Sequence, residues 1–484
     1  MTIRQSPNWY DKGSDRLSLA AGNISGSWIL WLGLFFVALA LLGGSSRPDP
    51  IQNAALRPIA ALLLIPALYR LRIADLAGAR AMLALGGLML GWMILQLIPM
   101  PPALWQALPG RATIAELDGL AGLQGMWRPI SLTPFRGLNA VFGMIVPIAA
   151  LLLALSARLK TQGLLLAIAG LGIVNAAFGI LQVIGGPNSP LYLFAITSRG
   201  SPAGIFANEN HGAVLASIVL LIITRLAVEG RDRGLPAWPK LSLVPAYIFV
   251  LVAVLISGSR AGLATALLAI CAGALMIGMG WLSDKTPSPG ADQPGKRERR
   301  FGLIALIGGA SGIILIVAMF LMLGRSPAAQ DLLPSTAFED IRWSLWPVLA
   351  TMMSEHWLVG TGFGSFDAVY RLYEPTALLT PLYINQAHND WAQLVVEGGL
   401  PAAAALLGLI GWLGVSVWRL LRRGPAFRSI VVFWIAWLAI IMAASLVDYP
   451  LRTPIFQAVS IWLLLCLAQD CRSRTDGIDR RQLS

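Results

Sequence analysis

The chain has 484 residues, of which 56% are hydrophobic and only 12% charged, and its mean hydropathy is +0.70. This composition excludes a soluble globular protein, because a soluble core has no room for so much apolar surface, and it predicts a polytopic membrane protein. The formal charge of +12 does not indicate nucleic-acid binding, since the basic residues are spread over short loops beside the membrane.

The predicted elements are apolar stretches of about 17 to 25 residues, the length that crosses a hydrocarbon core of about 30 Å. We predict helices, because lipid leaves unpaired backbone groups unsatisfied and the runs are continuous rather than alternating. In chain order the spans are 27–44, 54–69, 81–98, 138–157, 163–184, 208–228, 243–257, 261–282, 301–323, 394–418, 429–446 and 454–469. The expected fold class is an all-α polytopic membrane protein with about twelve transmembrane helices.

The basic residues predict the orientation. All five lysines lie at the N-terminus or in the loops after even-numbered spans, as do the basic runs 296–300 and 419–428. By the positive-inside rule these segments and both termini are cytoplasmic. The expected organisation is a cytoplasmic segment without a cleavable signal peptide, one transmembrane domain that includes a large periplasmic loop, and a cytoplasmic tail: 1–26, 27–469 with loop 324–388, and 470–484. The three cysteines fall in spans or in the tail, so we expect no disulfide.

Outer loop 324–388 is long and polar, and such loops are usually functional. All three histidines, His211, His356 and His388, are on the predicted outer side. Gly360–Gly364 does not have the spacing of a dinucleotide-binding loop, and a tight turn is the plain alternative.

Arginine is the only cation predicted on the outer side. Arg260 lies in a very short turn between two spans, where a charge needs a partner or a ligand. Arg342 follows two acids, so an ion pair with Glu339 or Asp340 is its alternative. The remaining scattered arginines are expected to extend from helix ends into solvent: Arg47, Arg57, Arg111, Arg128 and Arg325.

The order of several motifs resembles the family of O-antigen ligases and Wzy-type O-antigen polymerases, over residues 129–400. They are Pro129–Pro134, Gly204–Asn210, Ser259-Arg260, Arg342-Trp343, His356–Phe366, His388-Asn389 and Glu397–Leu400. The resemblance implies an inner-membrane glycosyltransferase that acts on the periplasmic face. Its donor would be an undecaprenyl-diphosphate-linked glycan, and its acceptor another glycan or the lipid A core. The resemblance implies neither metal nor cofactor; other polysaccharide assembly or export proteins are its expected partners.

The chemistry of such a transfer assigns roles to these residues. Without a metal, fixed guanidiniums must stabilise the departing diphosphate, and Arg260 and Arg342 are the candidates. His388 is the candidate base for the acceptor hydroxyl, with Asn389 beside it. Each has a plainer alternative, since His388–Asp390 is also a good N-terminal helix cap.

Supporting roles are considered for five further residues. His356 is expected mainly to pack or hydrogen-bond within the loop, and Asn208 and Asn210 with His211 also resemble a helix cap. Arg199 and Arg452 are outer-facing beside helix ends, and Asp448 is close enough in sequence to pair with Arg452.

Two other classes remain open. A transporter or flippase commonly has twelve helices, although here the polar residues gather in an outer loop rather than near the midplane. A non-catalytic component of a polysaccharide export system would tolerate alanine at Arg260, Arg342 and His388. The sequence does not distinguish a ligase from a polymerase.

Overall fold

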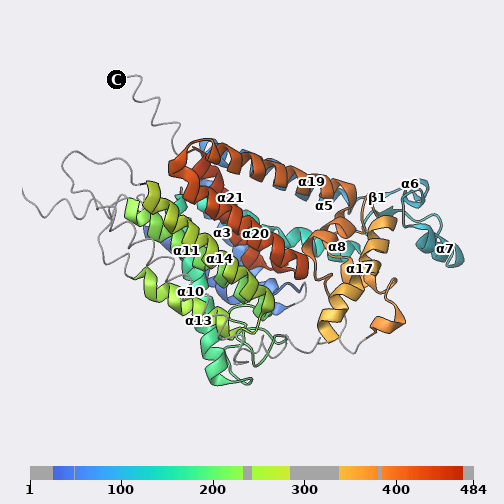
Figure 1. The fold of residues 1–484 in the computed structure, drawn as a ribbon. Helices are drawn as coiled ribbons and strands as arrows, with labels where there is room; N and C mark the ends of the chain where they lie inside the picture. The colour runs from blue at the N-terminus through green and yellow to red at the C-terminus, as the bar shows by residue number, and fades with distance from the viewer. Residues whose placement is uncertain (1–25, 48–49, 233–241, 284–336, 380–383, 473–484) are drawn as a thin grey trace, which may run out of the picture.

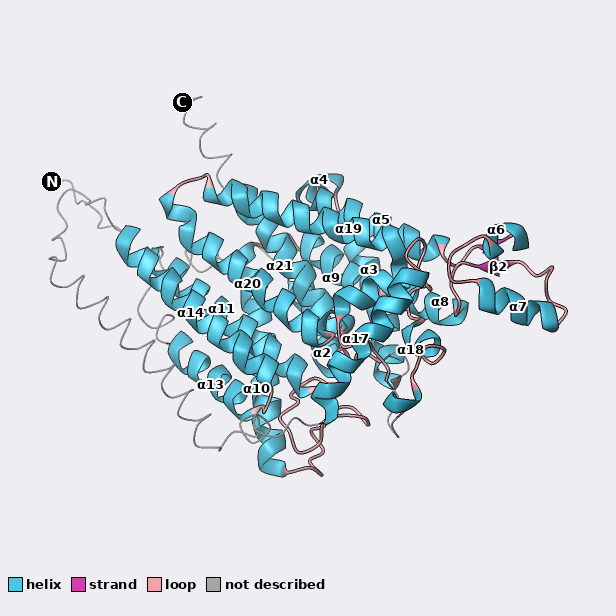
Figure 2. Ribbon diagram, turned by 45° about the vertical axis from the view of Figure 1, so that its right-hand side comes forward, coloured by secondary structure: helices cyan, strands magenta, loops and turns pink. Residues whose placement is uncertain are grey.

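The structure is a computed structural model, and it describes residues 26–47, 50–232, 242–283, 337–379 and 384–472. Most of the described chain is helical, with one short strand pair, β1 (Pro99–Met100) and β2 (Arg128–Pro129), in which Pro99 pairs with Pro129 and Met100 with Arg128 (Figure 2). Long helices lie side by side in a bundle, and a small lobe with the two strands projects from one end (Figure 1).

The first half of the chain contains α2 (Gly26–Leu42), α3 (Ile51–Arg70), α4 (Ile73–Leu76), η1 (Ala77–Ala79), α5 (Arg80–Leu95), α6 (Pro102–Gln106), α7 (Ala112–Leu120), α8 (Pro134–Gly143), α9 (Ile145–Ser156), α10 (Thr161–Gly185) and α11 (Glu209–Asp232). The second half contains α13 (Leu243–Ile256), α14 (Arg260–Ser283), α17 (Ala337–Glu355), α18 (Phe366–Tyr370), η2 (Thr376–Leu378), α19 (Asp390–Leu421), η3 (Pro425–Phe427), α20 (Arg428–Val447), η4 (Pro450–Arg452) and α21 (Pro454–Arg472).

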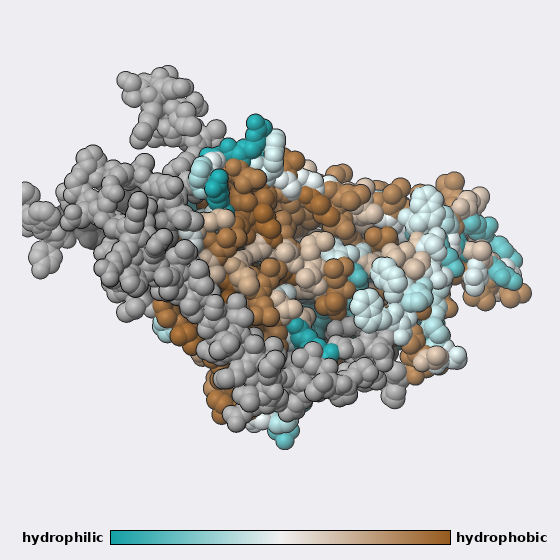
Figure 3. All heavy atoms as spheres, viewed as in Figure 1, coloured by the Kyte–Doolittle hydropathy of each residue, from teal (hydrophilic) through white to brown (hydrophobic). Residues whose placement is uncertain are grey.

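Within the described residues, nine helices are long and apolar enough to cross a membrane, and two shorter apolar helices, Trp28–Leu42 and Leu243–Ile256, accompany them. Each of these eleven coincides with a span predicted from the sequence. The remaining predicted span, 301–323, lies outside the described residues, so the total of twelve stays a prediction. An all-α membrane protein is confirmed, and Figure 3 shows apolar surface over the middle of the bundle with hydrophilic residues towards its ends.

Helix α11 is the centre of the bundle. Of its apolar window 94% is buried inside the protein, more than in any other span of the described chain. Small residues on neighbouring helices let them approach closely: a Cβ at Gly262 of α14 would lie 2.3 Å from Ala213, and one at Gly172 of α10 would lie 2.3 Å from Val219. Close backbone approach replaces the hydrophobic drive that is missing between helices in lipid.

A buried charge cluster joins α11, α20 and α21. Arg225 is 2% exposed; its Nη2 lies 2.8 Å from an Asp470 oxygen and its Nε lies 2.7 Å from Glu229. Trp434 donates its ring N–H to Asp470 at 2.9 Å, and the guanidinium of Arg225 also lies over the Phe433 ring at 4.7 Å. We call the end of the bundle that holds this cluster the arginine end, and the end that holds His388 the histidine end.

We expect Arg225→Met to destabilise the protein by roughly 3–5 kcal/mol, because it leaves the buried Asp470 carboxylate without its cation. The double variant Arg225→Met with Asp470→Leu should recover at least half of this loss, since both charges are then removed. Unfolding in detergent, followed by tryptophan fluorescence, measures both effects. A single variant that unfolds like the wild type would contradict the structural role of the pair.

Candidate active site

Asp448 is the centre of the histidine end. It follows the last residue of α20 and is only 2% exposed. The side-chain amides of Asn210 and Asn208, at the start of α11, donate to its Oδ2 at 2.9 and 3.3 Å. A buried carboxylate needs such donors to replace its lost hydration. The carboxylate therefore joins two helix ends that are far apart in sequence.

Two histidines lie beside the same carboxylate. His211 Nε2 is 3.6 Å and His388 Nδ1 is 3.8 Å from Asp448 Oδ1, and the Tyr449 ring meets both imidazoles edge-on. These distances exceed a hydrogen bond, but they place the carboxylate opposite one ring nitrogen of each histidine. His211 is buried, whereas the His388 side chain is 22% exposed. Of the two, only His388 offers a ring edge to a substrate.

The backbone of His388 has φ +51, a left-handed conformation that non-glycine residues seldom adopt. Directly after it, Asn389 caps α19 by accepting a hydrogen bond from Ala392 N at 3.0 Å. The helix cap and the positioning of the imidazole are therefore two aspects of one turn. The cap fixes where α19 begins, and the strained residue before it turns towards Asp448.

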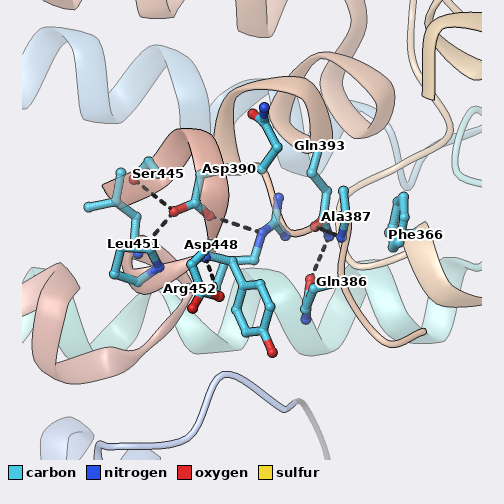
Figure 4. Close-up of polar contacts among 12 residues, drawn as sticks. Phe366, Gln386, Ala387, Asp390, Gln393, Ser445, Asp448, Leu451 and Arg452 are labelled. Atoms are coloured by element: carbon cyan, nitrogen blue, oxygen red, sulfur yellow. Dashed lines mark hydrogen bonds and ion pairs between the residues drawn. The ribbon is translucent and has the colours of Figure 1, made fainter. Parts of the chain in front are cut away.

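Arg452 binds two acids of α19, as Figure 4 shows for Asp390. Its Nη1 donates to Glu397 Oε2 at 3.0 Å, and its Nε lies 3.5 Å from Asp390 Oδ1. Asp390 also accepts from Ser445 Oγ at 3.0 Å. The alternative of a salt bridge between Arg452 and Asp448 does not agree with these contacts: Arg452 binds the two acids of α19, and Asp448 faces the histidines.

The glycine segment 360–364 docks on a break in α19. Gly399 has φ +63, and Pro401 has no N–H, so the carbonyl of Glu397 lacks its helical donor. That carbonyl accepts from Gly362 N at 2.9 Å instead. A Cβ at Gly360 would lie 2.3 Å from the same oxygen, which explains a glycine at that position. The tight-turn interpretation of this segment agrees with the structure.

His356 belongs to a separate polar cluster, which joins the loop between α5 and α8 to the loop after α17. Arg111 is fully buried and donates to His356 Nδ1 at 3.1 Å and to the Gly360 carbonyl at 2.9 Å. Because a guanidinium only donates, His356 carries its proton on Nε2, 2.9 Å from the Tyr373 hydroxyl, which in turn donates to Glu355 at 2.6 Å. The expectation that Arg111 extends into solvent is wrong, and the structural interpretation of His356 agrees with these contacts.

We expect the contacts of this cluster, which join His356 to Arg111 and Tyr373, to weaken in acid. Burial, and then the nearby Arg111 charge, lower the pKa of His356 from 6.5 to about 4, so the folded loop resists protonation. The unfolded loop takes up the proton first, so stability is complete above about pH 6.5 and is lost as the pH falls towards 4. Hydrogen exchange of the Gly360 amide, corrected for its intrinsic rate, should be faster at pH 4.5 than at pH 7.

A His356→Gln variant is the control, because glutamine does not titrate. Its Gly360 amide should show the same protection at both pH values. Equal loss of protection in the variant and the wild type would assign the pH dependence to another group.

A cavity of about 700 Å³ adjoins the histidine end. Its lining comes from residues 46–47, α3, α5, α8, α9, the segment 363–371 that includes α18, the loop 385–386, the start of α19 and the segment 451–457. Gln386 and Asp390, two residues before and after His388, form part of this wall. The cavity therefore reaches the segment that carries the exposed imidazole.

The candidate residues are only partly brought together. Four of them meet at Asp448 or in the adjacent cap: His388, Asn389, Asn208 and Asn210. Arg260 is half-buried at the first residue of α14, and the packing of Gly262 on Ala213 places it at the histidine end. Arg342 lies in α17, with its side chain outside the described part. Arg199 lies elsewhere, donating to the Pro187 carbonyl at 3.2 Å.

The sequence did not place His211, Asp448 and Tyr449 beside His388, and it did not pair Asp390 and Glu397 with Arg452. A signal was available for Asp448, an acid directly after an apolar span, but its partners lie 60 residues or more away along the chain. Within the described residues, no group of three or more His, Cys, Asp and Glu side chains is arranged to hold a metal ion.

Comparison with known families finds that residues 245–407 match the O-antigen ligase family (Wzy_C). The matched region runs from α13 to the middle of α19 and includes Arg260, Arg342 and His388. It confirms the resemblance seen in the motifs and supports a membrane enzyme of glycan transfer. No curated protein matches the chain significantly.

Proposed function

We propose, from this match to the O-antigen ligase family, that the chain is a glycosyltransferase that moves a glycan from an undecaprenyl-diphosphate carrier to an acceptor hydroxyl. The acceptor is a lipid A core sugar if the enzyme is a ligase, or another carrier-linked glycan if it is a polymerase. The observation that carries the proposal is the imidazole of His388, exposed on one edge and faced by Asp448 on the other.

In this reaction the acceptor oxygen attacks the anomeric carbon while the bond from that carbon to the diphosphate oxygen breaks. The bonding electron pair leaves with the carrier diphosphate, and the acceptor proton passes to Nε2 of His388. Asp448 faces Nδ1, which favours a proton there and leaves Nε2 as the basic nitrogen. The carboxylate also stabilises the imidazolium that forms.

The departing diphosphate needs positive charge, and we assign Arg260 and Arg342 to it. The position of Arg260 at the histidine end supports this assignment, because α14 packs beside α11, which carries His211. For Arg342 the support is its place in the matched region and in a helix that precedes the glycine turn.

We also propose that the histidine end faces the periplasm and that the enzyme lies in the bacterial inner membrane. The basic loops, which the positive-inside rule assigns to the cytoplasm, support this orientation. The basic segment Arg419–Arg428 joins the end of α19 to the start of α20 at the arginine end, opposite to His388, which agrees with this orientation.

We expect His388→Ala to lower transfer at least about 100-fold while donor binding is retained, because proton removal matters in the transition state. The assay is transfer from purified undecaprenyl-diphosphate-linked glycan, with EDTA present throughout. A variant that keeps more than about a tenth of the wild-type rate would exclude His388 as the base. Loss of wild-type activity in EDTA would exclude a metal-free mechanism.

We expect Arg260→Ala to lower the same rate about 100-fold and Arg260→Lys to restore it only in part, since lysine supplies a charge but not the planar fork. Arg199→Ala is a matched control, because Arg199 contacts only its own outer loop in the described structure, and it should retain transfer. A transfer rate in Arg260→Lys equal to that of the wild type would show that a bidentate contact with the diphosphate is not required.

Analysis of the glycans in a deletion strain distinguishes the two forms of the proposal. Unattached full-length polymer indicates a ligase, whereas single capped repeat units indicate a polymerase. Normal glycans would contradict both.

A further inference from the structure

The cavity beside the histidine end carries an excess of positive charge. Its described lining contains five arginines and three carboxylates. The carboxylates are bound by two of the arginines: Asp367 pairs with Arg136, while Asp390 and Glu397 pair with Arg452. The other three arginines of the described lining are Arg47, Arg57 and Arg371.

Arg57 is the most informative of these three. It is the seventh residue of α3, so it lies roughly 9 Å along the axis of a predicted membrane span, at 1.5 Å per residue. Within the described structure it donates to the amide oxygen of Asn139 and pairs with no carboxylate. A half-buried cation in a membrane helix that has only a neutral acceptor is an expensive arrangement, and such groups usually mark a ligand site.

The surroundings of Arg57 leave room for a ligand. Gly143 faces its guanidinium, and a Cβ built there would lie 3.7 Å from Nη2, so any larger side chain would enter this space. The cavity volume of about 700 Å³ lies within the usual range of small-molecule pockets, about 300–1,000 Å³. Polar amides such as Asn53 and Gln386 line it together with apolar side chains. This mixture suits a sugar that carries an acidic substituent.

The cavity also lies apart from the proposed diphosphate site. Neither α11 nor α14 contributes to its described lining, whereas Arg260 begins α14. The His388–Asp448 pair lies between the two regions, since Gln386 and Asp390 belong to the cavity wall and Asp448 binds the start of α11. Transfer between two substrates needs two binding regions that meet at the base, and the cavity adjoins the segment that carries His388 without a contribution from α11 or α14.

We propose that this cavity binds the acceptor and that Arg57 recognises a negatively charged substituent, a carboxylate or a phosphate, on an acceptor sugar. The naming of the ligand as the acceptor rests on the proposed transfer function. The anion site itself rests only on the cavity and its charges.

The test compares the binding of methyl β-glucuronide with that of its uncharged analogue, methyl β-glucoside. Binding to the purified full chain in nanodiscs is measured by saturation-transfer NMR. The wild type should bind the glucuronide at least about tenfold more tightly, the usual effect of a hydrogen bond to a charged group. Arg57→Gln should abolish this preference. Arg70→Gln, at the other end of α3, is the matched control and should retain it.

Asn139→Asp is a second variant that keeps Arg57 but supplies an internal carboxylate beside it. It should also lose the preference for the acidic sugar. Equal binding of the two sugars by the wild type, or an unchanged preference in Asn139→Asp, would overturn the anion site.

A third arm adds saturating undecaprenyl diphosphate. Glucuronide binding should persist, because the carrier occupies the other region. Displacement by the carrier would assign the cavity to the donor and overturn the proposal. None of these measurements requires transfer, so failure of the His388 mechanism and failure of this site are distinguishable.

Discussion

The histidine end depends on the burial of one carboxylate. Asp448 is 2% exposed, and two asparagine amides and two imidazoles surround it. A negative charge withdrawn from water is tolerated only where fixed donors and polar rings replace its hydration, so these groups are drawn to it from α11 and from the turn before α19. In this arrangement the imidazole of His211 is buried beside the carboxylate, whereas the imidazole of His388 keeps an accessible edge.

A second group of charged residues lies between the start of α19 and the cavity, and its members have different partners. Arg452 pairs with both Asp390 and Glu397, and these ion pairs hold the start of α19 against the turn between α20 and α21. The acids near the cavity are thereby bound, and Arg57 is left with an amide acceptor in a space of about 700 Å³. Opposite charges thus hold these chain segments together, and the contact of Arg57 with a neutral amide is the basis of the anion site that we propose.

The sequence predicts the helices well and the contacts between them poorly. Apolar runs long enough to cross lipid leave helices as the one stable solution, and α3, α10 and α20 fall where composition places them. His388 is recognised because its motif and the helix cap are local in sequence. The partners of Asp448, Arg111 and Arg57 are not local: Arg111 meets His356 across 245 residues. Whether an arginine reaches solvent or a cavity is decided by tertiary packing, which no local pattern encodes.

The tautomer of His388 tests the role of Asp448 most directly, and it is read from the ¹⁵N shifts of the neutral imidazole ring in the protein in nanodiscs. With only three histidines in the chain, substitution of each assigns the signals. We expect a proton on Nδ1 and a bare Nε2 in the wild type, and a change of this state in Asp448→Asn. A wild-type His388 with its proton on Nε2, or one that is indifferent to Asp448→Asn, would contradict the claim that Asp448 prepares the base.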